Sequence, residues 1–286
     1  MWPNSTRLNT VKNFVVPSVF RAAWRKLMSD CCHHHPVWDG DFVRCLRNRG
    51  TDEDKRFALA SVWSVNMVVG SYCFPRYVAA LAARAEMDAV RHGLLENAWD
   101  ESGSYNHTSR SHFWLAVKLA RLLGLRDDEI ERIEPLPEAQ KYTDEHYRQC
   151  AVGDFAFALG MICLIEEFTT PEFSMIFNAF LQSCQQGMNL SPGDFVLMGG
   201  AEYFTANITD DERHREEMPQ LVAILLDSDG VDLNDERAVT RALSGVRDGA
   251  SYSSDLRMHF FEGIYQFVKS GGTMRRLMTE TRGALS

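Results

Sequence analysis

The chain has 286 residues, of which 45% are apolar and 24% charged, and its formal net charge is −9. This composition is that of an ordinary globular protein and excludes disorder as the main state. The negative charge argues against a protein that binds nucleic acid by neutralising phosphates. No apolar run reaches the roughly 18 residues of a membrane span, so we expect neither a transmembrane helix nor a membrane partner.

The N-terminal segment and the cysteines indicate the compartment. The first residues, MWPNSTRLNTVKNF, lack the continuous apolar stretch of a signal peptide. The seven cysteines are an odd number and lie mostly within apolar stretches, which favours free thiols in a reducing environment. We therefore expect a cytoplasmic protein without a disulfide framework.

Helical periodicity dominates the chain, and alternating strand patterns are nearly absent. Gly and Pro punctuate the apolar segments, so breaks are expected at Pro75 and Pro171, each in the first turn of a new helix. The predicted helices span residues 17–28, 40–48, 54–69, 73–100, 112–123, 127–149, 152–168, 171–187, 192–225, 236–244 and 255–270. The pattern predicts an all-α protein with an N-terminal extension over residues 1–30 and a single helical domain over residues 31–286.

The strongest chemical signal is the segment from Asn207 to His214. Asn207, Asp211 and His214 are spaced i, i+4 and i+7, so a helix would place them on one face. The oxygen and nitrogen donors of Asp211 and His214 suit a metal such as iron or manganese. Because this stretch is rich in Asp, Glu and Arg, a solvated helix face is the alternative.

A second signal is a pair of glutamates, Glu166 and Glu167, at the end of the apolar segment FALGMICLIEE. Burial of an ionised carboxylate is costly unless it is paired or binds a metal. Successive helix positions point about 100° apart, so at most one of the two is expected to face the interior. In the alternative, both lie in water at a helix end just before Pro171.

A third group lies between the helices predicted at 73–100 and 112–123. Glu101 sits at a helix C-terminal end, where the dipole disfavours negative charge, and a cation or metal would compensate it. His107 and His112 follow, and we prefer His112, in the first turn of the next helix. The ordinary alternative is a capped helix start with a core histidine.

Four predicted helices thus supply Glu, His, Glu and an Asp–His pair, the ligand inventory of a carboxylate-bridged di-metal site in a helical bundle. The order of these motifs resembles the haem-oxygenase-like di-iron oxidase superfamily, the iron-containing redox enzymes related to PqqC and TenA. The resemblance runs from about His35 to Tyr265 and implies a single seven-helix bundle that binds no haem. It rests on His35-Pro36, Phe74-Pro75-Arg76, the segment 91–103, Ser111-His112, the glutamate before Pro171, the Asn207–His214 motif and the segment 260–265.

Carried over position by position, the resemblance assigns as metal ligands Glu101, His112, Glu167, Asp211 and His214. Glu166, Asn207 and His107 are second-rank candidates. Glu167 is preferred to Glu166 because it shares a helix face with small residues such as Gly160, which permit the close helix approach of a metal cluster. Asn207 stands where the family has His, and an amide oxygen binds iron more weakly, so the second iron is expected to be weak or labile.

The resemblance implies an oxygen-activating enzyme that binds two Fe²⁺ ions and uses O₂ on a small amine- or carboxylate-bearing metabolite. N-oxygenation, oxidative decarboxylation and C–C cleavage are all open, in a pathway of specialised metabolite biosynthesis. Arg76, Arg91 and Lys118 are candidates for binding a substrate carboxylate, and a homodimer is common in this fold. The alternatives are a metal-free enzyme of the PqqC or TenA type, which Asn207 favours, and a non-catalytic helical binding protein.

Overall fold

The computed structural model describes residues 14–103 and 111–279, without the side chains of residues 210, 211, 278 and 279. These residues form helices and contain no strand, which confirms the all-α prediction. The α-helices are α1 (Ser18–Met28), α2 (Asp41–Arg47), α3 (Glu53–Arg84), α4 (Asp88–Ser102), α5 (His112–Leu122), α6 (Asp127–Ile130), α7 (Pro137–Val152), α8 (Phe155–Met188), α9 (Pro192–Phe195), α10 (Glu202–Ser228), α11 (Glu236–Ala242), α12 (Ser244–Lys269) and α13 (Met274–Thr279). Short turns of other helix types are η2 (Ser29–His33), η3 (Pro36–Asp39) and η4 (Val196–Gly200).

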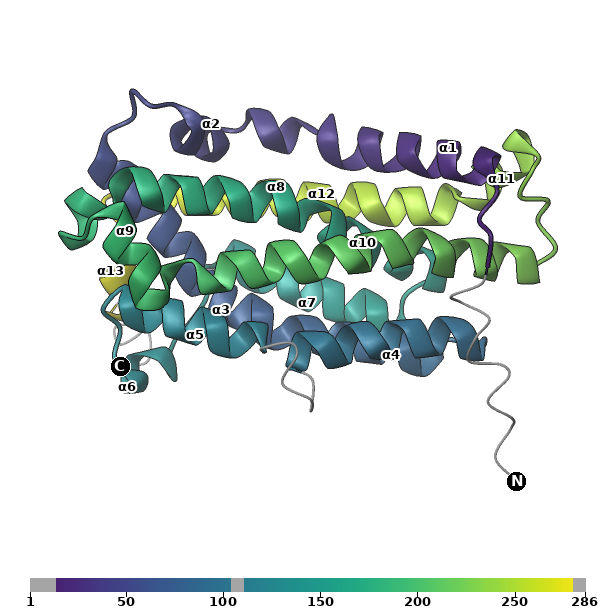
Figure 1. Cartoon of the computed structure of the whole chain (residues 1–286), viewed down its shortest axis with the longest axis horizontal. Coiled ribbons are helices and arrows are strands. Elements are labelled where there is room, and N and C mark those ends of the chain that lie inside the picture. The colour runs from purple at the N-terminus through teal and green to yellow at the C-terminus, as the bar shows by residue number, and fades with distance from the viewer. Residues whose placement is uncertain (1–13, 104–110, 280–286) are drawn as a thin grey trace.

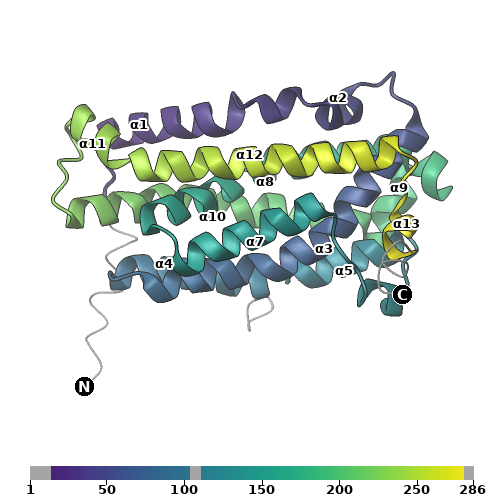
Figure 2. The ribbon, with the colours of Figure 1, turned by 180° about the vertical axis from the view of Figure 1, so that it is seen from behind.

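The bundle consists of α3, α4, α5, α7, α8, α10 and α12, which lie side by side along its long axis (Figure 1). These are the seven bundle helices that the resemblance implies, and several short helices connect them in the described chain. α3 and α8 pack on one another at the centre. α10 lies on the face seen in Figure 1, where it packs on α4, whereas α7 and α12 pack together on the opposite face (Figure 2).

The helix breaks predicted at two prolines are wrong. α3 continues through Pro75, and α8 continues through Pro171. A proline inside a helix removes one backbone hydrogen bond and costs about 3 kcal/mol. Both helices are buried along most of their length, and we attribute their continuity to this packing, which outweighs the local penalty. The break before α4 falls instead after Arg84.

Two further boundaries differ from the prediction. The charged segment 127–149 divides into the short helix α6 and the longer α7, which begins at Pro137. α12 begins at Ser244, well before the predicted residue 255. The early start of α12 follows from its packing on α8, which buries residues such as Val246 and Ala250.

α8 and α12 approach each other closely at two glycines. A Cβ atom at Gly160 would lie 2.0 Å from the carbonyl oxygen of Val246, and a Cβ at Gly249 would lie 1.9 Å from that of Phe157. Neither position has room for a side chain. The Gly160 face of α8 therefore packs against α12, on the side of the bundle away from α4 and α10.

α1 lies along the outside of the bundle (Figure 1). It buries Phe20, Trp24, Leu27 and Met28, which belong to the same hydrophobic core as the bundle helices. Within the described residues, α3 is the one helix whose length and composition would suit a membrane span. Its apolar window is 56% buried inside the fold, as in a central core helix.

Candidate metal centre

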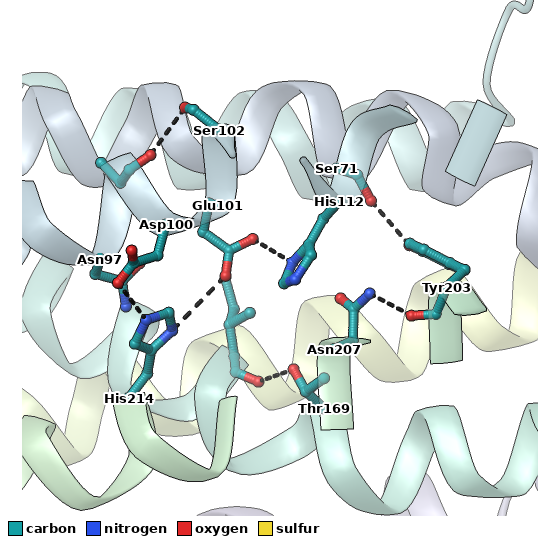
Figure 3. A network of polar contacts seen from close by, with 12 residues as sticks. Ser71, Asn97, Asp100, Glu101, Ser102, His112, Thr169, Tyr203, Asn207 and His214 are labelled. Atoms are coloured by element: carbon teal, nitrogen blue, oxygen red, sulfur yellow. Dashed lines mark hydrogen bonds and ion pairs between the residues drawn. The ribbon is translucent and has the colours of Figure 1, made fainter. Parts of the chain in front are cut away.

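Four buried side chains converge inside the bundle, each from a different helix. They are Glu101 of α4, His112 of α5, Glu166 of α8 and His214 of α10, and none is more than 4% exposed. Nδ1 of His112 lies 2.6 Å from Oε2 of Glu101. Nδ1 of His214 lies 3.7 Å from Oε1 of Glu101 and 3.6 Å from Oε2 of Glu166. Both imidazoles therefore present Nδ1 to the carboxylates, as Figure 3 shows for Glu101.

Local structure places Glu101 and His112 at two neighbouring helix ends. Glu101 lies in the last turn of α4, and His112 is the first residue of α5. α4 ends at Gly103, which has φ +88°, a conformation that glycine adopts without strain. Because α4 and α5 pack against each other, the two side chains meet inside the bundle.

The structure places Glu166, and not the preferred Glu167, at the cluster. Glu166 faces the centre, whereas the Glu167 carboxylate lies 2.9 Å from Nε2 of His33 and is 14% exposed. Adjacent helix positions point about 100° apart, so one side chain excludes the other from the centre. The small-residue face used in the prediction serves a different contact, because Gly160 packs against the backbone of Val246 in α12.

Asn97 and Asp100 contact the ligand candidates on the side away from the centre, and the sequence assigned neither of them a role. Asn97 donates a 2.6 Å hydrogen bond from Nδ2 to Oε1 of Glu166. Asp100 lies 3.6 Å from Nε2 of His214 and is paired with Arg213. Groups of this kind orient metal ligands and tune their basicity. The spacing of Asn97 and Glu101, one helical turn apart, is the signal that could have revealed the first of them.

Asn207 is buried and lies beside the cluster. Its Nδ2 donates to the backbone carbonyl of Tyr203 at 2.7 Å, and Figure 3 shows the amide oxygen turned toward Glu101. That oxygen is a neutral donor of the kind that can bind a hard cation. The His107 position and the Asp211 side chain lie outside the described part of the structure.

The chemistry of this cluster fits iron. Oε2 of Glu166 is buried and has no hydrogen-bond partner among the described residues. Two carboxylates and two imidazoles are a donor set suited to iron, and burying the carboxylates is costly unless a cation compensates them. The described side chains form no group of three or more His, Cys, Asp or Glu already arranged to hold an ion. The fit therefore rests on donor chemistry and burial.

Of the three predicted substrate-binding cations, Arg76 is the one that the structure brings to a groove lined by Glu101. Its guanidinium lies 3.8 Å from the ring centroid of Tyr72. Arg91 instead pairs with Asp88 at 2.8 Å, and Lys118 pairs with Glu202 at 2.7 Å. Both of these pairs lie on the surface.

An internal cavity adjoins the candidate centre at Glu101 and Asn207. Most of its wall is apolar, with Phe74, Ile165 and Phe173 among the lining residues. On the α7 and α12 side the lining includes Tyr142 and Arg257, which carry no distinctive signal in the sequence. The cavity thus has the ligand candidates Glu101 and Asn207 in the same lining as Tyr142 and Arg257.

Comparison with known proteins gives both relatives in sequence and neighbours in fold. The chain is 27% identical over 178 residues to 4-aminobenzoate synthases of Chlamydia trachomatis serovar D and Chlamydia muridarum; this covers 61% of the chain and 71% and 69% of those proteins. A TenA homologue from Pseudomonas syringae pv. tomato superimposes with a TM-score of 0.63 and 12% identity, over 88% of this chain and 99% of that one. A domain with a haem-oxygenase-like fold from Shewanella denitrificans superimposes with a TM-score of 0.53 and 16% identity, over 95% of this chain and 97% of that one. These two structures share the fold.

The family model of iron-containing redox enzymes matches residues 61–244, more than half of the chain. The matched segment contains all four converging side chains, Glu101, His112, Glu166 and His214. The match confirms the prediction of an oxidoreductase and supports that of iron, and it argues against the non-catalytic binding protein. As the resemblance in its motifs predicts, this chain belongs to the family of iron-containing redox enzymes.

Proposed function

We propose that the protein is an oxygen-activating non-haem di-iron oxidase or oxygenase that acts on a small amine- or carboxylate-bearing metabolite. The observation that carries this proposal is the buried convergence of Glu101, His112, Glu166 and His214 from four helices. A buried set of carboxylates and imidazoles needs a cation to offset its charge.

The roles of the residues follow from their positions. Glu101, His112, Glu166 and His214 would hold the iron, with Asn207 beside them as a further ligand. The ligand role of Asp211 rests on the family resemblance alone. Bound iron supplies redox chemistry with dioxygen, for which carboxylate ligands stabilise the higher oxidation states. Asn97 fixes the orientation of the Glu166 carboxylate through its 2.6 Å hydrogen bond. The apolar cavity wall excludes bulk water from the reacting molecule.

The relatives support a biosynthetic role. They are named 4-aminobenzoate synthases, after a compound that carries an amine and a carboxylate. The cavity beside the ligand candidates has the apolar walls and the few polar groups that a compound of this class requires. A small aromatic or aliphatic amino acid derivative is therefore our preferred substrate class.

A metal-free enzyme with the same pocket is the second candidate. Two observations favour it: the fold similarity to a TenA homologue, and Asn207 in place of a stronger imidazole donor. The buried Oε2 of Glu166, which has no hydrogen-bond partner in the described part of the chain, favours the iron enzyme instead.

Anaerobic titration of the iron-free protein with Fe²⁺, followed by stopped-flow mixing with O₂, tests the proposal. Two irons per chain and a transient visible absorbance, both lost in His214→Ala and Asp211→Ala, are the expected result. One iron per chain would indicate a mononuclear site. Absence of iron binding, with circular dichroism unchanged, would instead favour the metal-free enzyme.

A further inference from the structure

The cavity wall includes Arg257, which forms a buried ion pair with Glu172 behind the wall. Arg257 of α12 is 4% exposed and lies 3.1 Å, through Nη1, from Oε1 of Glu172 in α8. Its Nη2 donates a 2.6 Å hydrogen bond to the hydroxyl of Tyr142 in α7. The guanidinium also stacks 4.4 Å from the Tyr142 ring centroid. Arg257 is thus held rigidly at the cavity.

The partner of Arg257 is not fully satisfied. Oε1 of Glu172 accepts from both Arg257 and Nε1 of Trp63, the latter at 2.6 Å. Oε2 of the same carboxylate is buried and, among the described residues, has no hydrogen-bond partner. Burial raises the pKa of Glu172 above its ordinary range, although Arg257 opposes this shift. A buried pair with one unsatisfied oxygen stabilises a fold poorly, so the position of Arg257 on the cavity wall points to another role for this residue.

The described lining of the cavity has one acidic and one basic side chain, on different walls. Among the described residues that line it, the acidic and basic side chains are Glu101 and Arg257. Glu101 and Asn207 come from α4 and α10, which pack together, whereas Arg257 and Tyr142 come from α12 and α7, which pack on the other face. α3 and α8 lie between these pairs and supply apolar residues such as Phe74 and Phe173.

We propose that Arg257, together with the Tyr142 hydroxyl, binds the carboxylate of the substrate at the end of the cavity opposite Glu101. A guanidinium is the side chain best suited to bind a carboxylate through paired hydrogen bonds. The ligand class is then a small carboxylate with an apolar body, whose reacting group lies toward Glu101 and Asn207. The direction of the reacting group rests on the proposed iron centre, whereas carboxylate binding by Arg257 does not.

Glu172 and the bound carboxylate would share the positive charge of Arg257. Removal of Glu172 and removal of Arg257 should therefore change the carboxylate affinity in opposite directions. Isothermal titration calorimetry of the full iron-free chain would measure the affinity for 4-aminobenzoate and hexanoate, with neutral 4-aminobenzamide as the control ligand. Glu172→Gln removes the competing negative charge and should tighten carboxylate binding severalfold. The double variant Arg257→Met, Glu172→Gln should bind the carboxylates at least about tenfold more weakly than Glu172→Gln. Amide binding should stay the same in all three proteins.

Two results would overturn the proposal. One is equal carboxylate affinity in Glu172→Gln and in the double variant, which would leave Arg257 as a structural residue. The other is a wild-type protein that binds neither carboxylate. Thermal unfolding checks that the variants fold. If the double variant does not fold, Glu172→Gln alone tests the proposal, because its carboxylate affinity should exceed that of the wild type. The iron titration is separate: carboxylate binding without iron binding would refute the proposed oxygenase and keep the Arg257 site.

Discussion

Nδ1 of His112 lies 2.6 Å from Oε2 of Glu101, with both side chains almost completely buried. The contact joins the last turn of α4 to the first turn of α5, across a chain segment outside the described residues. It holds one carboxylate and one imidazole of the candidate centre against each other. Two of the proposed ligands are thus positioned by the fold itself, as a metal site requires.

The neighbouring glutamates provide a matched test of the candidate centre. Glu166→Ala should weaken Fe²⁺ binding at least about 100-fold, since removal even of outer residues costs 10- to 100-fold. Glu167→Ala should leave Fe²⁺ affinity unchanged, because this carboxylate faces His33. Anaerobic equilibrium dialysis followed by iron analysis measures both. The reverse order of effects would return the ligand role to Glu167.

Asn97 should act on the metal through Glu166. Its 2.6 Å hydrogen bond to Oε1 fixes the carboxylate, so Asn97→Ala should lower Fe²⁺ affinity about 10- to 100-fold. Ser102→Ala, on the same helix, is the control, because the Ser102 hydroxyl donates to the backbone of Ala98 at 2.8 Å. Equal iron affinity in the two variants would contradict a supporting role for Asn97.

We expect Asn207 to set how strongly a second iron binds. Imidazole is a stronger donor to iron than a neutral amide oxygen, so Asn207→His should raise the iron content per chain at limiting Fe²⁺. Asn207→Ala should lower it below that of the wild type. Iron content after anaerobic gel filtration measures both variants. If Asn207→Ala retained the wild-type content, the amide would not be a ligand.

His146 should make stability depend on pH. Burial lowers the pKa of His146 to about 3, whereas an unfolded histidine titrates near 6.5. Between these values the unfolded state binds a proton that the folded state does not, so stability falls as the pH decreases. From pH 7 to pH 5 the loss should be about 2 kcal/mol. Urea unfolding at both pH values should show a smaller loss in His146→Gln, while the surface variant His92→Gln behaves like the wild type.

The contact between α8 and α12 should not tolerate a methyl group. A Cβ at Gly160 would lie 2.0 Å from a backbone oxygen, so the helices would have to separate. We expect Gly160→Ala to cost about 1–3 kcal/mol of the free energy of unfolding. Gly193→Ala is the control, since the nearest atom to its Cβ beyond the adjacent residues would be the Ser191 hydroxyl oxygen at 3.8 Å. Comparable stability of the two variants in urea would show that the crossing adapts.

The helical class and most residues of the candidate site follow from the sequence alone. Helical periodicity and the i, i+4, i+7 spacing are local properties, so they can be read without knowing the packing. The family resemblance added the order of Glu101, His112 and His214 along the chain. Local rules failed at Pro75 and Pro171, where both helices continue despite the lost backbone hydrogen bond.

The packing of the helices sets which glutamate faces the centre and which charge lies across the cavity. Glu166 and Glu167 differ by one helix position, and the rotation of α8 depends on Gly160 packing against α12. Arg257 and Glu172 are 85 residues apart in sequence, and they meet only because α8 and α12 pack together. Contacts of this kind depend on how helix faces are buried against one another, and no local pattern of residues encodes that arrangement.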